Sequence, residues 1–368
     1  MIYFLINNNY HYEMDLNLAN QLSSNKLGLI QVPYSLNVIN ESDLFSDVLC
    51  LPYKIVPSLI GFLINPFKIF VIQKEVISKI KPNCDDILLV HTDMDLLNQF
   101  IIQLFYNVKA KIFILEDGTS TMCTCNLIPQ KAPLKDRIKA LILNKIYKFK
   151  YTDIAVYGKQ ILPVMKDFVF KGVIVNYGDY IRRDIPLYKL PSLKDPIEIL
   201  YEKGAIFFSQ GLYFWYLKED EYINYVDNLL TISVNFDCFY FKFHPTDNEY
   251  VKTTLTKLIN EKYSNVTIIS ENYVAEIIIN KYPVRYAITF NSTAALNLIN
   301  KGVVPIFLNN LLNNTFPNSE FLAFNQFLES INCRVPVKLS DVKPGFRAFS
   351  DLTANENTKS ITDILNNI

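Results

Sequence analysis

The sequence lacks the features that mark metal-binding or nucleic-acid-binding proteins. Its 36 Lys and Arg residues are balanced by 36 Asp and Glu residues, so no overall charge favours a nucleic acid partner. Its six cysteines include no CxxC pair, and the one close pair, Cys123 and Cys125, is a weak metal signal. We therefore expect reduced thiols, as in the cytoplasm, and no metal site.

The sequence also lacks a leader and a clean apolar span. Residues 1–15 have neither a basic leader nor a long apolar core, so we expect a first strand there rather than a signal peptide. The most apolar stretch, residues 51–72, is broken by Pro52, Pro57 and Pro66 and contains two lysines. It falls short of the roughly 20 apolar residues that a membrane span needs, and we expect no transmembrane helix.

Half of the residues are hydrophobic, and many of them form short apolar runs that alternate with segments of helical spacing. This alternation is typical of parallel sheets with crossover helices. The runs, with the residues that end them, are 1–6, 86–91, 111–118, 152–158, 204–211, 239–245, 266–270, 286–292 and 303–308. A stretch rich in Pro and charge at residues 182–204 indicates a connection between two α/β domains, 1–190 and 191–368, that face one another across a cleft.

Ligands of open parallel sheets bind beyond the carboxyl ends of the strands, and four of these ends carry polar residues. Glu116, Asp117 and Gly118 follow the run KIFIL. A partly desolvated Asp117 would act there as a general base toward a substrate hydroxyl. Asp-Gly pairs also fill ordinary turns, and Asp caps helices, so a structural role for Asp117 stays open.

His244 is one of only three histidines, and it closes the aromatic run FDCFYFKFHP. Pro245 restricts it to an extended backbone, and its imidazole is able to donate to an anionic oxygen. Lys242, two residues earlier, would share its face of the strand. Thr246 and Asp247 offer a helix start, which is the structural alternative for His244.

Two other strand ends are rich in small polar residues. The stretch FNSTAA ends an apolar run and opens a helix, so Ser292 and Thr293 stand with free backbone N–H groups at a typical anion site. Helix capping by either hydroxyl is the structural alternative. Ser209, Gln210 and Gly211 form a small turn where backbone would approach a ligand closely.

Three further residues near a strand end have structural explanations. Asp93 and Asp95 resemble a metal-binding DxD pair, but Thr92 or Asp93 is favoured as a helix cap. His91 ends the run DILLV and would either line the cleft or satisfy a neighbouring carbonyl.

Residues 131–150 form a basic segment with apolar residues at helical spacing. The segment contains seven Lys or Arg residues and one Asp, and its apolar residues are Leu134, Ile138, Leu141, Ile142 and Ile146. A basic amphipathic helix of this kind suits an anionic membrane surface. A helix packed on the sheet through the apolar residues, with solvated lysines outside, explains the same pattern.

The order of the motifs, EDG, then HP, then a Ser-Thr pair that opens a helix, resembles that of bacterial sialyltransferases. The pattern is most similar to the lipooligosaccharide sialyltransferases of glycosyltransferase family 52, with the capsular polysialyltransferases of family 38 as relatives. The resemblance covers the motif positions and the strand order of most of the chain. It implies the GT-B fold: an N-terminal acceptor-binding and a C-terminal donor-binding Rossmann-like domain, with a final helix that returns to the N-terminal domain.

The resemblance also implies a role for each motif. Asp117 would deprotonate the acceptor hydroxyl, and His244 would bind or protonate the departing CMP phosphate. Ser292 and Thr293 would hold the same phosphate. The other donor-binding residues would be Glu276, on the ribose hydroxyls, with Ser209, Gln210, Gly211, Lys242 and Pro245. The acceptor side or the cleft would contain Asn8, His91, Glu116 and Gly118.

Together these features predict an inverting, metal-independent sialyltransferase without a cofactor. It would move sialic acid from CMP-sialic acid to a hydroxyl, such as that of galactose, in a lipooligosaccharide, O-antigen or capsule acceptor. The protein would be cytoplasmic, with peripheral contact to the inner face of the membrane through residues 131–150. The alternatives are a transferase of another CMP-activated acid (legionaminic, pseudaminic or 3-deoxy-manno-octulosonic acid), a family 52 glucosyltransferase, and a non-catalytic nucleotide- or glycan-binding module.

Overall fold

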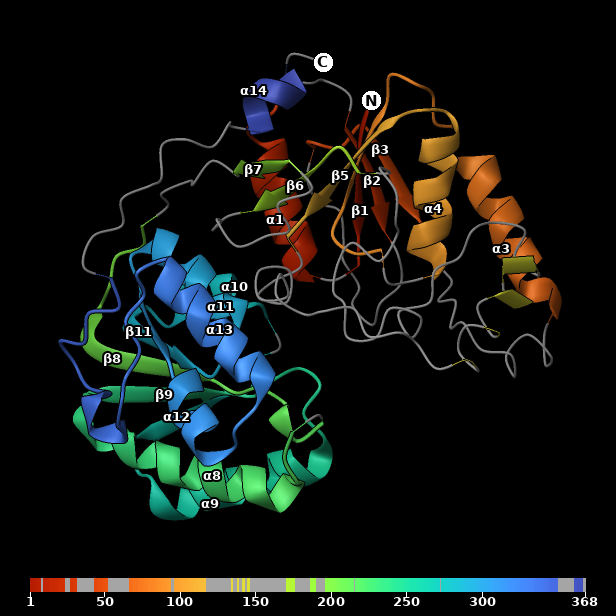
Figure 1. Cartoon of the computed structure of the whole chain (residues 1–368). Helices are drawn as coiled ribbons and strands as arrows, with labels where there is room; N and C mark the ends of the chain where they lie inside the picture. The colour runs from red at the N-terminus through yellow and green to blue at the C-terminus, as the bar shows by residue number, and fades with distance from the viewer. Residues whose placement is uncertain are drawn as a thin grey trace. The chain divides into compact units, whose positions relative to one another are not determined.

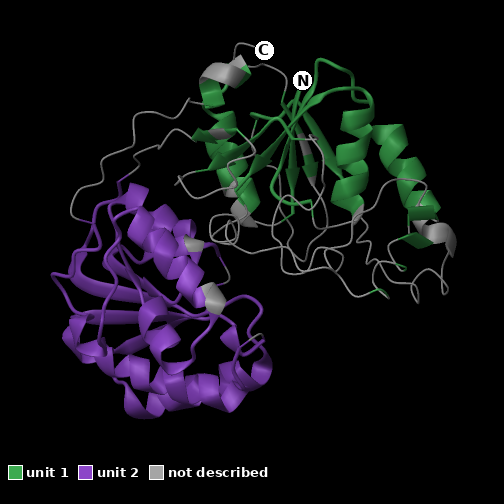
Figure 2. Ribbon diagram, viewed as in Figure 1, with its two compact units in different colours: residues 1–191, 355–368 green, residues 192–354 purple. Residues whose placement is uncertain are grey.

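The chain folds into two compact units in the computed structural model, and each is built on its own sheet. Unit 1 comprises residues 1–191 and 355–368, and unit 2 comprises residues 192–354 (Figure 2). The structure describes residues 1–7, 9–23, 27–31, 43–51, 66–93, 96–116, 134, 138, 141, 142, 144, 145, 170–175, 186–189, 196–214, 216–271, 273–349 and 361–366. The predicted strand at 152–158 lies outside these residues, as do the candidate site residues Asn8, Asp117 and Gly118.

Unit 1 contains a seven-stranded sheet in the order β3-β2-β1-β4-β5-β6-β7, and all its pairs are parallel. The strands are β1 (Ile2–Ile6), β2 (Leu27–Gln31), β3 (Asp47–Cys50), β4 (Ile87–Val90), β5 (Lys111–Leu115), β6 (Gly172–Val175) and β7 (Leu187–Lys189). Every residue of β4 and β6 is buried, as expected for parallel strands covered on both faces.

Helices cover both faces of the unit 1 sheet. They are α1 (Asn9–Ala19), α3 (Pro66–Lys79), α4 (Leu96–Asn107) and α14 (Ile361–Asn366), with α3 and α4 on one side and α1 and α14 on the other (Figure 1). Residues of β1 alternate between the two apolar clusters: Leu5 packs with the residues of α3 and α4, whereas Phe4 packs with Leu18 and Ile361.

Unit 2 contains a five-stranded parallel sheet in the order β10-β9-β8-β11-β12. Its strands are β8 (Tyr201–Phe208), β9 (Cys238–Lys242), β10 (Val266–Ile269), β11 (Val284–Thr289) and β12 (Val304–Phe307). Its helices are α8 (Glu219–Leu230), α9 (Glu249–Lys262), α10 (Ala275–Lys281), α11 (Thr293–Asn297), α12 (Asn309–Thr315) and α13 (Ser319–Ser330). The two parallel sheets confirm the predicted α/β class.

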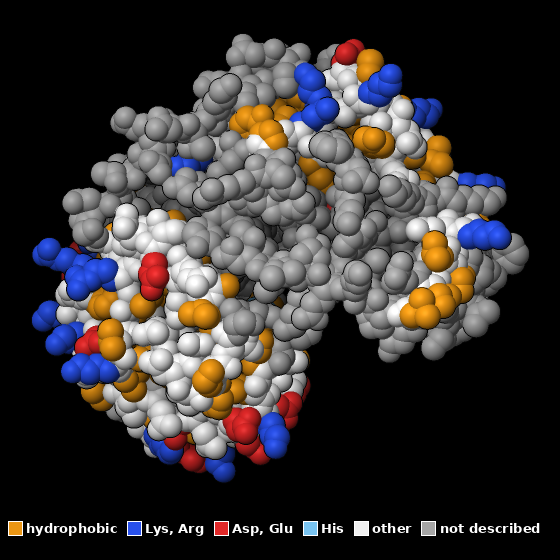
Figure 3. All heavy atoms as spheres, viewed as in Figure 1, with side chains coloured by type: hydrophobic (Ala, Val, Ile, Leu, Met, Phe, Trp, Pro, Cys, Tyr) orange, Lys and Arg blue, Asp and Glu red, His pale blue; other side chains and the backbone are white. Residues whose placement is uncertain are grey.

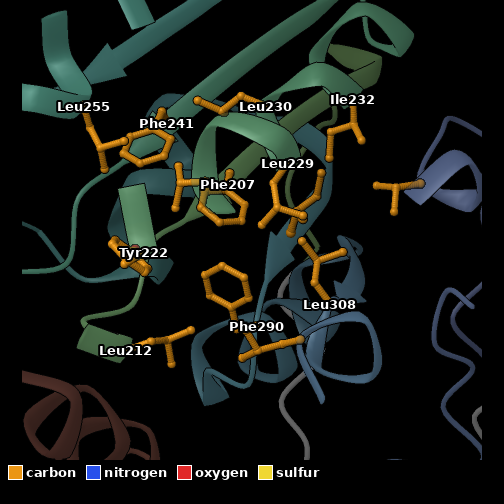
Figure 4. Close-up of a cluster of buried hydrophobic side chains, with 14 of the residues drawn as sticks. Phe207, Leu212, Tyr222, Leu229, Leu230, Ile232, Phe241, Leu255, Phe290 and Leu308 are labelled. Atoms are coloured by element: carbon orange, nitrogen blue, oxygen red, sulfur yellow. The ribbon is translucent and has the colours of Figure 1, made fainter. Parts of the chain in front are cut away.

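Aromatic side chains fill the core behind the strand ends of unit 2 (Figure 4). The ring of Phe207 on β8 lies 5.5 Å from that of Phe241 on β9 and 5.5 Å from that of Phe290, which follows β11. Tyr222 of α8 closes the cluster from the helix layer. Such ring pairs stabilise a core by more than the burial of their surface alone. The same aromatic cluster therefore supports the ends of β8, β9 and β11.

The strand order reverses direction once in each sheet, between β1 and β4 in unit 1 and between β8 and β11 in unit 2. Ligands of open α/β sheets bind at such switch points, outside the carboxyl ends of the strands. In unit 1 the residues at this point are Asn7 and His91, and in unit 2 they are Ser209 and Asn291. These two edges are therefore where the site residues belong.

Two boundaries differ from the sequence-based expectation. The predicted connection at 182–204 contains strand β7 and the start of β8, because both segments pair with a neighbouring strand. Helix α9 begins at Glu249, where the side chain of Asn248 accepts the backbone N–H of Val251, so neither Thr246 nor Asp247 starts it. Helix α4 is described from Leu96, and residues 94 and 95 lie outside the described residues, so the cap by Thr92 or Asp93 stays a prediction.

Two surface properties, hydrophobic helices and charge, are visible in the described part of the chain. No helix in that part is long and apolar enough to cross a membrane. On the face of unit 2 that Figure 3 displays, Lys and Arg side chains are interspersed with Asp and Glu side chains. Both signs of charge therefore share this face.

Candidate functional site

Asp247 organises the carboxyl edge of β8 and β9 in unit 2. Its Oδ2 accepts the backbone N–H of His244 at 2.8 Å and the hydroxyl of Ser209 at 2.8 Å. Its Oδ1 accepts the hydroxyl of Tyr213 at 3.2 Å, and the carboxylate is buried. Sequence reasoning gave Asp247 only a place at a helix start. The buried Asp247 carboxylate joins the residues that follow β8, Ser209 and Tyr213, to the backbone of His244 after β9.

Two tyrosines complete the Asp247 network. The backbone N–H of Asn248 donates to the Tyr213 hydroxyl at 2.8 Å, and the Tyr222 hydroxyl donates to Ser209 Oγ at 3.3 Å. Burial raises the pKa of Tyr213 to about 12, and burial also raises the pKa of Tyr222. Both hydroxyls therefore stay protonated and act as hydrogen-bond donors at neutral pH. Nothing in the local sequence marked these tyrosines as part of the site.

The imidazole of His244 is fixed through one of its two nitrogens. The backbone N–H of Thr246 donates to His244 Nδ1 at 3.3 Å, and the Thr246 hydroxyl lies 2.7 Å from the same nitrogen. Nδ1 is therefore the acceptor, and the proton of the neutral ring lies on Nε2. The ring is partly exposed, and Pro245 and Thr246 beside it are exposed. The Nε2–H group is the donor that this arrangement leaves for a ligand.

Charge and burial favour the neutral ring of His244. Burial lowers its pKa below the ordinary value, the Lys242 ammonium adds to that effect, and the Asp247 carboxylate opposes it. A negatively charged phosphate beside Nε2 would raise the pKa again, because an opposite charge favours the protonated ring. The ring is thus suited to bind a phosphate oxygen and to become a stronger donor as charge grows there.

Lys242 ends β9, between Phe208 of β8 and Ile269 of β10, and only 6% of its surface is exposed. Its Nζ donates to the carbonyl of Phe243 at 3.0 Å. Burial lowers its pKa, and the Asp247 carboxylate opposes the shift. Lys242 thus stands as a buried cation behind His244, where it affects the field at the site; direct contact with a donor stays a prediction.

Gln210 joins the end of β8 to the end of β11. Its Oε1 accepts the backbone N–H of Asn291 at 2.7 Å, and its Nε2 donates to Asn291 Oδ1 at 2.8 Å. Gly211 follows in close packing, because a Cβ atom there would stand 2.6 Å from the Phe214 ring. With Ser209 on Asp247, the SQG turn holds strand ends together through its side chains, and the donor-binding role of its residues stays a prediction.

The Ser292 hydroxyl accepts the backbone N–H of Ala294 at 3.2 Å and so caps α11. The helix has only five residues before it tightens into a 3₁₀ turn, so the expected anion site at a regular helix N-terminus is weaker than the sequence indicated. Thr293 is the first residue of α11, and its side chain lies outside the described part of the structure. The phosphate role of both residues stays a prediction.

Glu276 begins the first turn of α10, where its Oε1 accepts Nδ2–H of Asn297 at 2.9 Å. Burial raises its pKa, while the bond from Asn297 opposes the shift. The carboxylate thus links α10 to α11, beside the segment that begins at Ser292. Its role toward ribose hydroxyls stays a prediction.

In unit 1 the candidate residues are buried. His91 and Glu116 have no exposed surface, and their predicted place at the acceptor side or the cleft stays a prediction. His91 Nδ1 donates to the Glu116 carbonyl at 2.9 Å, and His91 Nε2 lies 3.0 Å from Asp15 Oδ1. The structural alternative for His91, satisfaction of a neighbouring carbonyl, is the one that the geometry shows. Asp117, Gly118 and Asn8 lie outside the described residues.

The DxD candidate has a buried member. Asp93 is fully buried, and its carbonyl accepts the side-chain amide of Gln99 at 2.7 Å. Asp95 lies outside the described residues. In the part of the chain that is described, no group of three His, Cys, Asp or Glu side chains is placed to hold a metal ion.

The apolar residues of the basic segment face solvent. Leu134, Ile138, Leu141 and Ile142 lie in helical backbone and are 70, 47, 69 and 43% exposed. The alternative in which these four residues pack on the sheet is therefore wrong. Ile146 lies outside the described residues.

No protein family model matches the sequence, and no curated protein is similar to it in sequence. Solved structures are similar in fold. A variant of Os79 from O. sativa in complex with UDP shares 10% identity over 90% of this chain and 84% of its own, with a TM-score of 0.52. MurG of Acinetobacter baumannii shares 10% identity over 100% of this chain and 88% of its own, with a TM-score of 0.46.

A third similar structure is the UDP-GlcNAc 2-epimerase of Methanocaldococcus jannaschii, with 9% identity over 100% of this chain and 99% of its own and a TM-score of 0.49. At such identities the likeness speaks for the fold alone. With the two parallel sheets, the likeness to the Os79 structure confirms the predicted GT-B fold of two Rossmann-like domains.

Proposed function

We propose that the chain is a glycosyltransferase that binds a nucleotide-sugar donor at the carboxyl edge of the unit 2 sheet, and that the donor is CMP-sialic acid. The observation that carries the proposal is the fixed imidazole of His244. Its Nδ1 is engaged by Thr246 and its backbone by Asp247, so Nε2–H is the ligand-facing donor. It stands beside the topological switch point, where GT-B-like sheets take nucleotides.

The chemistry of the donor fits this edge. In sialyl transfer, the bond between the anomeric carbon and a phosphate oxygen breaks, and CMP leaves with the electron pair. Negative charge therefore grows on the phosphate, where donors fixed in advance stabilise the transition state more than the ground state. His244 supplies such a donor, and the hydroxyls of Ser292 and Thr293 supply two more. A hydrogen bond to a charged group contributes about 1.5 to 3 kcal/mol.

The acceptor half of the reaction falls to unit 1. Asp117 takes the proton of the acceptor hydroxyl as its oxygen forms the new bond to the anomeric carbon, which inverts that centre. The preceding residue, Glu116, is anchored through its carbonyl by His91. Donors on the phosphate and a carboxylate base together account for the reaction without a resident cofactor or metal.

The choice of CMP rests on the order of the EDG, HP and Ser-Thr motifs, which resembles the sialyltransferases. Another CMP-activated acid would use the same residues. A UDP-sugar donor is the second candidate, because the Os79 structure of similar fold holds UDP.

A thermal-shift panel of CMP, CMP-sialic acid, UDP, GDP and dTDP separates these donors. We expect CMP and CMP-sialic acid to raise the melting temperature selectively, by RT ln(1 + [L]/Kd) in free energy, about 2.7 kcal/mol at a hundredfold excess over Kd. Selective stabilisation by UDP or dTDP would overturn the CMP assignment and keep a nucleotide site.

Transfer assays with Asp117→Ala then test catalysis. The variant should keep the CMP-induced shift and lose transfer by about 10² to 10⁴, the usual range for a general base. The matched control is Asp85→Ala, which removes an exposed carboxylate of the same unit. Equal loss of transfer and of CMP binding in Asp117→Ala would give Asp117 a structural role.

The exposed apolar residues of the basic segment support peripheral contact with an anionic membrane. Four apolar side chains face solvent in a segment whose sequence is rich in Lys and Arg. Near an anionic surface each basic residue contributes about 1 kcal/mol. We expect salt-sensitive binding to phosphatidylserine vesicles that Leu134→Ser with Leu141→Ser abolishes, whereas Val234→Ser, an exposed apolar residue of unit 2, has no effect. Equal binding by all variants would contradict the contact.

A further inference from the structure

One phenylalanine of unit 2 faces solvent at the carboxyl edge of the sheet. Phe214 ends the 3₁₀ turn Leu212–Phe214, which directly follows the SQG turn after β8, and 48% of its surface is exposed. Among the phenylalanine side chains that the structure describes it is the only exposed one, and the others are wholly or partly buried. A phenyl ring makes no polar contact that would explain its exposure, so its position at this edge calls for a physical reason.

Gly211 and Tyr213 hold the Phe214 ring against the loop. A Cβ atom on Gly211 would stand 2.6 Å from two atoms of the ring, so the ring packs directly on the glycine backbone. The Tyr213 ring lies against it, with centroids 4.4 Å apart and planes inclined by 38°. The Phe214 N–H donates to the Gly211 carbonyl at 3.1 Å. The ring is therefore oriented before a ligand arrives, which reduces the entropy that binding costs.

The same loop is joined to the residues that fix His244. The Cβ position of Gly211 that would meet the Phe214 ring lies 3.6 Å from Asp247 Oδ1. That oxygen accepts the Tyr213 hydroxyl at 3.2 Å, and Oδ2 of the same carboxylate accepts the His244 N–H at 2.8 Å. The exposed ring thus stands beside the network that holds the proposed phosphate donor.

The helices of unit 2 show on which side of its sheet the ring lies. Residues of α8 and α9 pack with the buried phenylalanines of β9. The next side chain along that strand, Tyr240, points the other way, and its ring lies 4.9 Å from that of Tyr282, which follows α10. Helices α8 and α10 therefore cover opposite faces of the sheet (Figure 1). Because the Tyr213 ring lies 5.3 Å from that of Tyr222 on α8, the Phe214 loop lies on the α8 side.

The donor that we propose has two groups on its phosphate, and the two faces of the sheet separate them. Glu276, the residue expected at the ribose hydroxyls, lies in the first turn of α10. His244, the residue proposed at the phosphate, follows β9 between the two helix layers. With the nucleoside on the α10 side, the sugar on another oxygen of the phosphate extends toward α8 and the Phe214 ring.

We propose that Phe214 is a sugar-binding residue, on which the apolar face of the donor's sugar ring stacks. The proposal rests on the proposed function, because it needs a nucleotide sugar whose phosphate lies at His244. A sugar ring presents C–H groups on its faces, and these pack against an aromatic ring without hydrogen bonds. Phe214 thus contacts the sugar, and the polar residues of the edge contact the nucleotide.

Calorimetric binding of CMP and of CMP-sialic acid to the full chain, without an acceptor, tests this role. We expect Phe214→Ala to leave the Kd of CMP unchanged and to raise that of CMP-sialic acid by about 3- to 10-fold. Covering half of a phenylalanine side chain yields about half of its full burial free energy, which sets this range. Phe214→Tyr keeps the ring and should restore most of the affinity. The control is Tyr201→Ala, which removes a 45% exposed aromatic side chain at the other end of β8.

Gly211→Ala tests whether the fixed ring is the cause of the effect. The added Cβ displaces the ring from the loop, so we expect the Kd of CMP-sialic acid to rise in the otherwise wild-type chain. In the Phe214→Ala background the same substitution should cause no further rise, because the two residues act through one contact. A rise of the same size in both backgrounds shows that the glycine acts independently of the ring, and it overturns the proposal.

Two results of the binding experiment also overturn the proposal. Equal weakening of CMP and CMP-sialic acid by Phe214→Ala means that the ring acts on the nucleotide or on the fold, and equal affinities of all variants mean that it contacts no ligand. If the thermal-shift panel selects UDP, the same comparison is made with UDP and UDP-galactose. The donor assignment then fails, and the sugar contact of Phe214 is still decided. A chain that binds no nucleotide sugar refutes both proposals.

Discussion

The two sheets of this chain place a histidine at a strand end beside their switch points, and the two histidines are held in different ways. His91 in unit 1 has no exposed surface, and both of its ring nitrogens are engaged, by Glu116 and Asp15. His244 in unit 2 is partly exposed, and only its Nδ1 is engaged, by Thr246. The same residue type at the same kind of edge is therefore an internal tie in unit 1, and in unit 2 it is the residue that we propose as a donor to the ligand.

The carboxylates beside the two histidines differ in the same way. Asp15 meets the ring of His91 directly, with its Oδ1 3.0 Å from His91 Nε2. Asp247 meets the backbone N–H of His244 and two hydroxyls, so it fixes where the ring stands without occupying it. The Asp247 carboxylate binds the main chain at His244 and leaves Nε2 of the ring without a carboxylate partner. The Asp15 carboxylate, in contrast, lies against Nε2 of the His91 ring. Four substitutions or conditions test this comparison.

The largest effect is expected from His244→Ala. Loss of the donor on the leaving phosphate should lower kcat by about 10² to 10⁴, the usual contribution of a positioned acid, and should weaken CMP binding. Steady-state kinetics with circular dichroism as a fold check measures it. Normal turnover in this variant would show that His244 does not contact the donor, and the proposed difference from His91 would be wrong.

Asp247→Asn should have the next largest effect. The neutral amide loses a charged acceptor for three hydrogen bonds, and each bond to a charged group contributes about 1.5 to 3 kcal/mol. We expect at least one such loss in the free energy of unfolding, measured in urea. The control is Asp220→Asn, an exposed carboxylate that accepts the Tyr250 hydroxyl at 2.7 Å and should change stability by less than about 0.5 kcal/mol. Equal losses in both variants would deny Asp247 its organising role.

Thr246→Val should have a moderate effect that is confined to catalysis. The substitution removes the hydroxyl beside His244 Nδ1 and leaves the backbone N–H that donates to it. The ring becomes freer, so we expect kcat to fall by up to about tenfold, within the range of one neutral hydrogen bond of about 0.5 to 1.5 kcal/mol. Thermal unfolding should not change, because Thr246 is exposed. A large loss of stability would mean that Thr246 holds the loop and not the ring.

The smallest effect is expected from pH. The folded-state pKa of His244 is lowered, chiefly by burial, so below about pH 6.5 the unfolded chain binds a proton that the folded chain does not. The free energy of unfolding should therefore decrease as pH falls from 7.5 through 6.5, and level off below the folded pKa. Urea unfolding of the wild-type chain and of His244→Gln measures it. The same slope in both proteins would assign the effect to another group.

The strands of unit 2 were all predicted from the sequence, whereas β2, β3, β6 and β7 of unit 1 were not. The predicted strands are mostly apolar runs, as expected in parallel sheets that are covered by helices. Two of the missed strands contain a glycine that packs against an aromatic ring from another strand: Gly28 against Tyr3, and Gly172 against Tyr188. Their stability comes from partners elsewhere in the chain, which local pattern does not reveal.

The site divides along the same line. The positions of His244, Ser209 and Ser292 after strands were predicted, because strand ends can be located from apolar runs. Asp247, Tyr213 and Asp15 were missed as site residues, because their roles depend on contacts across 34 to 76 positions of the chain. The burial of His91 was hidden for the same reason, since its partner Asp15 lies on another element.

The contrast between the two histidine edges is tested most directly by titrating CMP into ¹⁵N-histidine protein and following the three ring signals by NMR. We predict that the His244 signals shift with a saturable dependence on CMP concentration, toward a protonated ring, while those of His11 and His91 do not move. A stationary His244 at CMP concentrations that raise the melting temperature, or a response from His91 in its place, would contradict the assignment of the donor site to the open edge of unit 2.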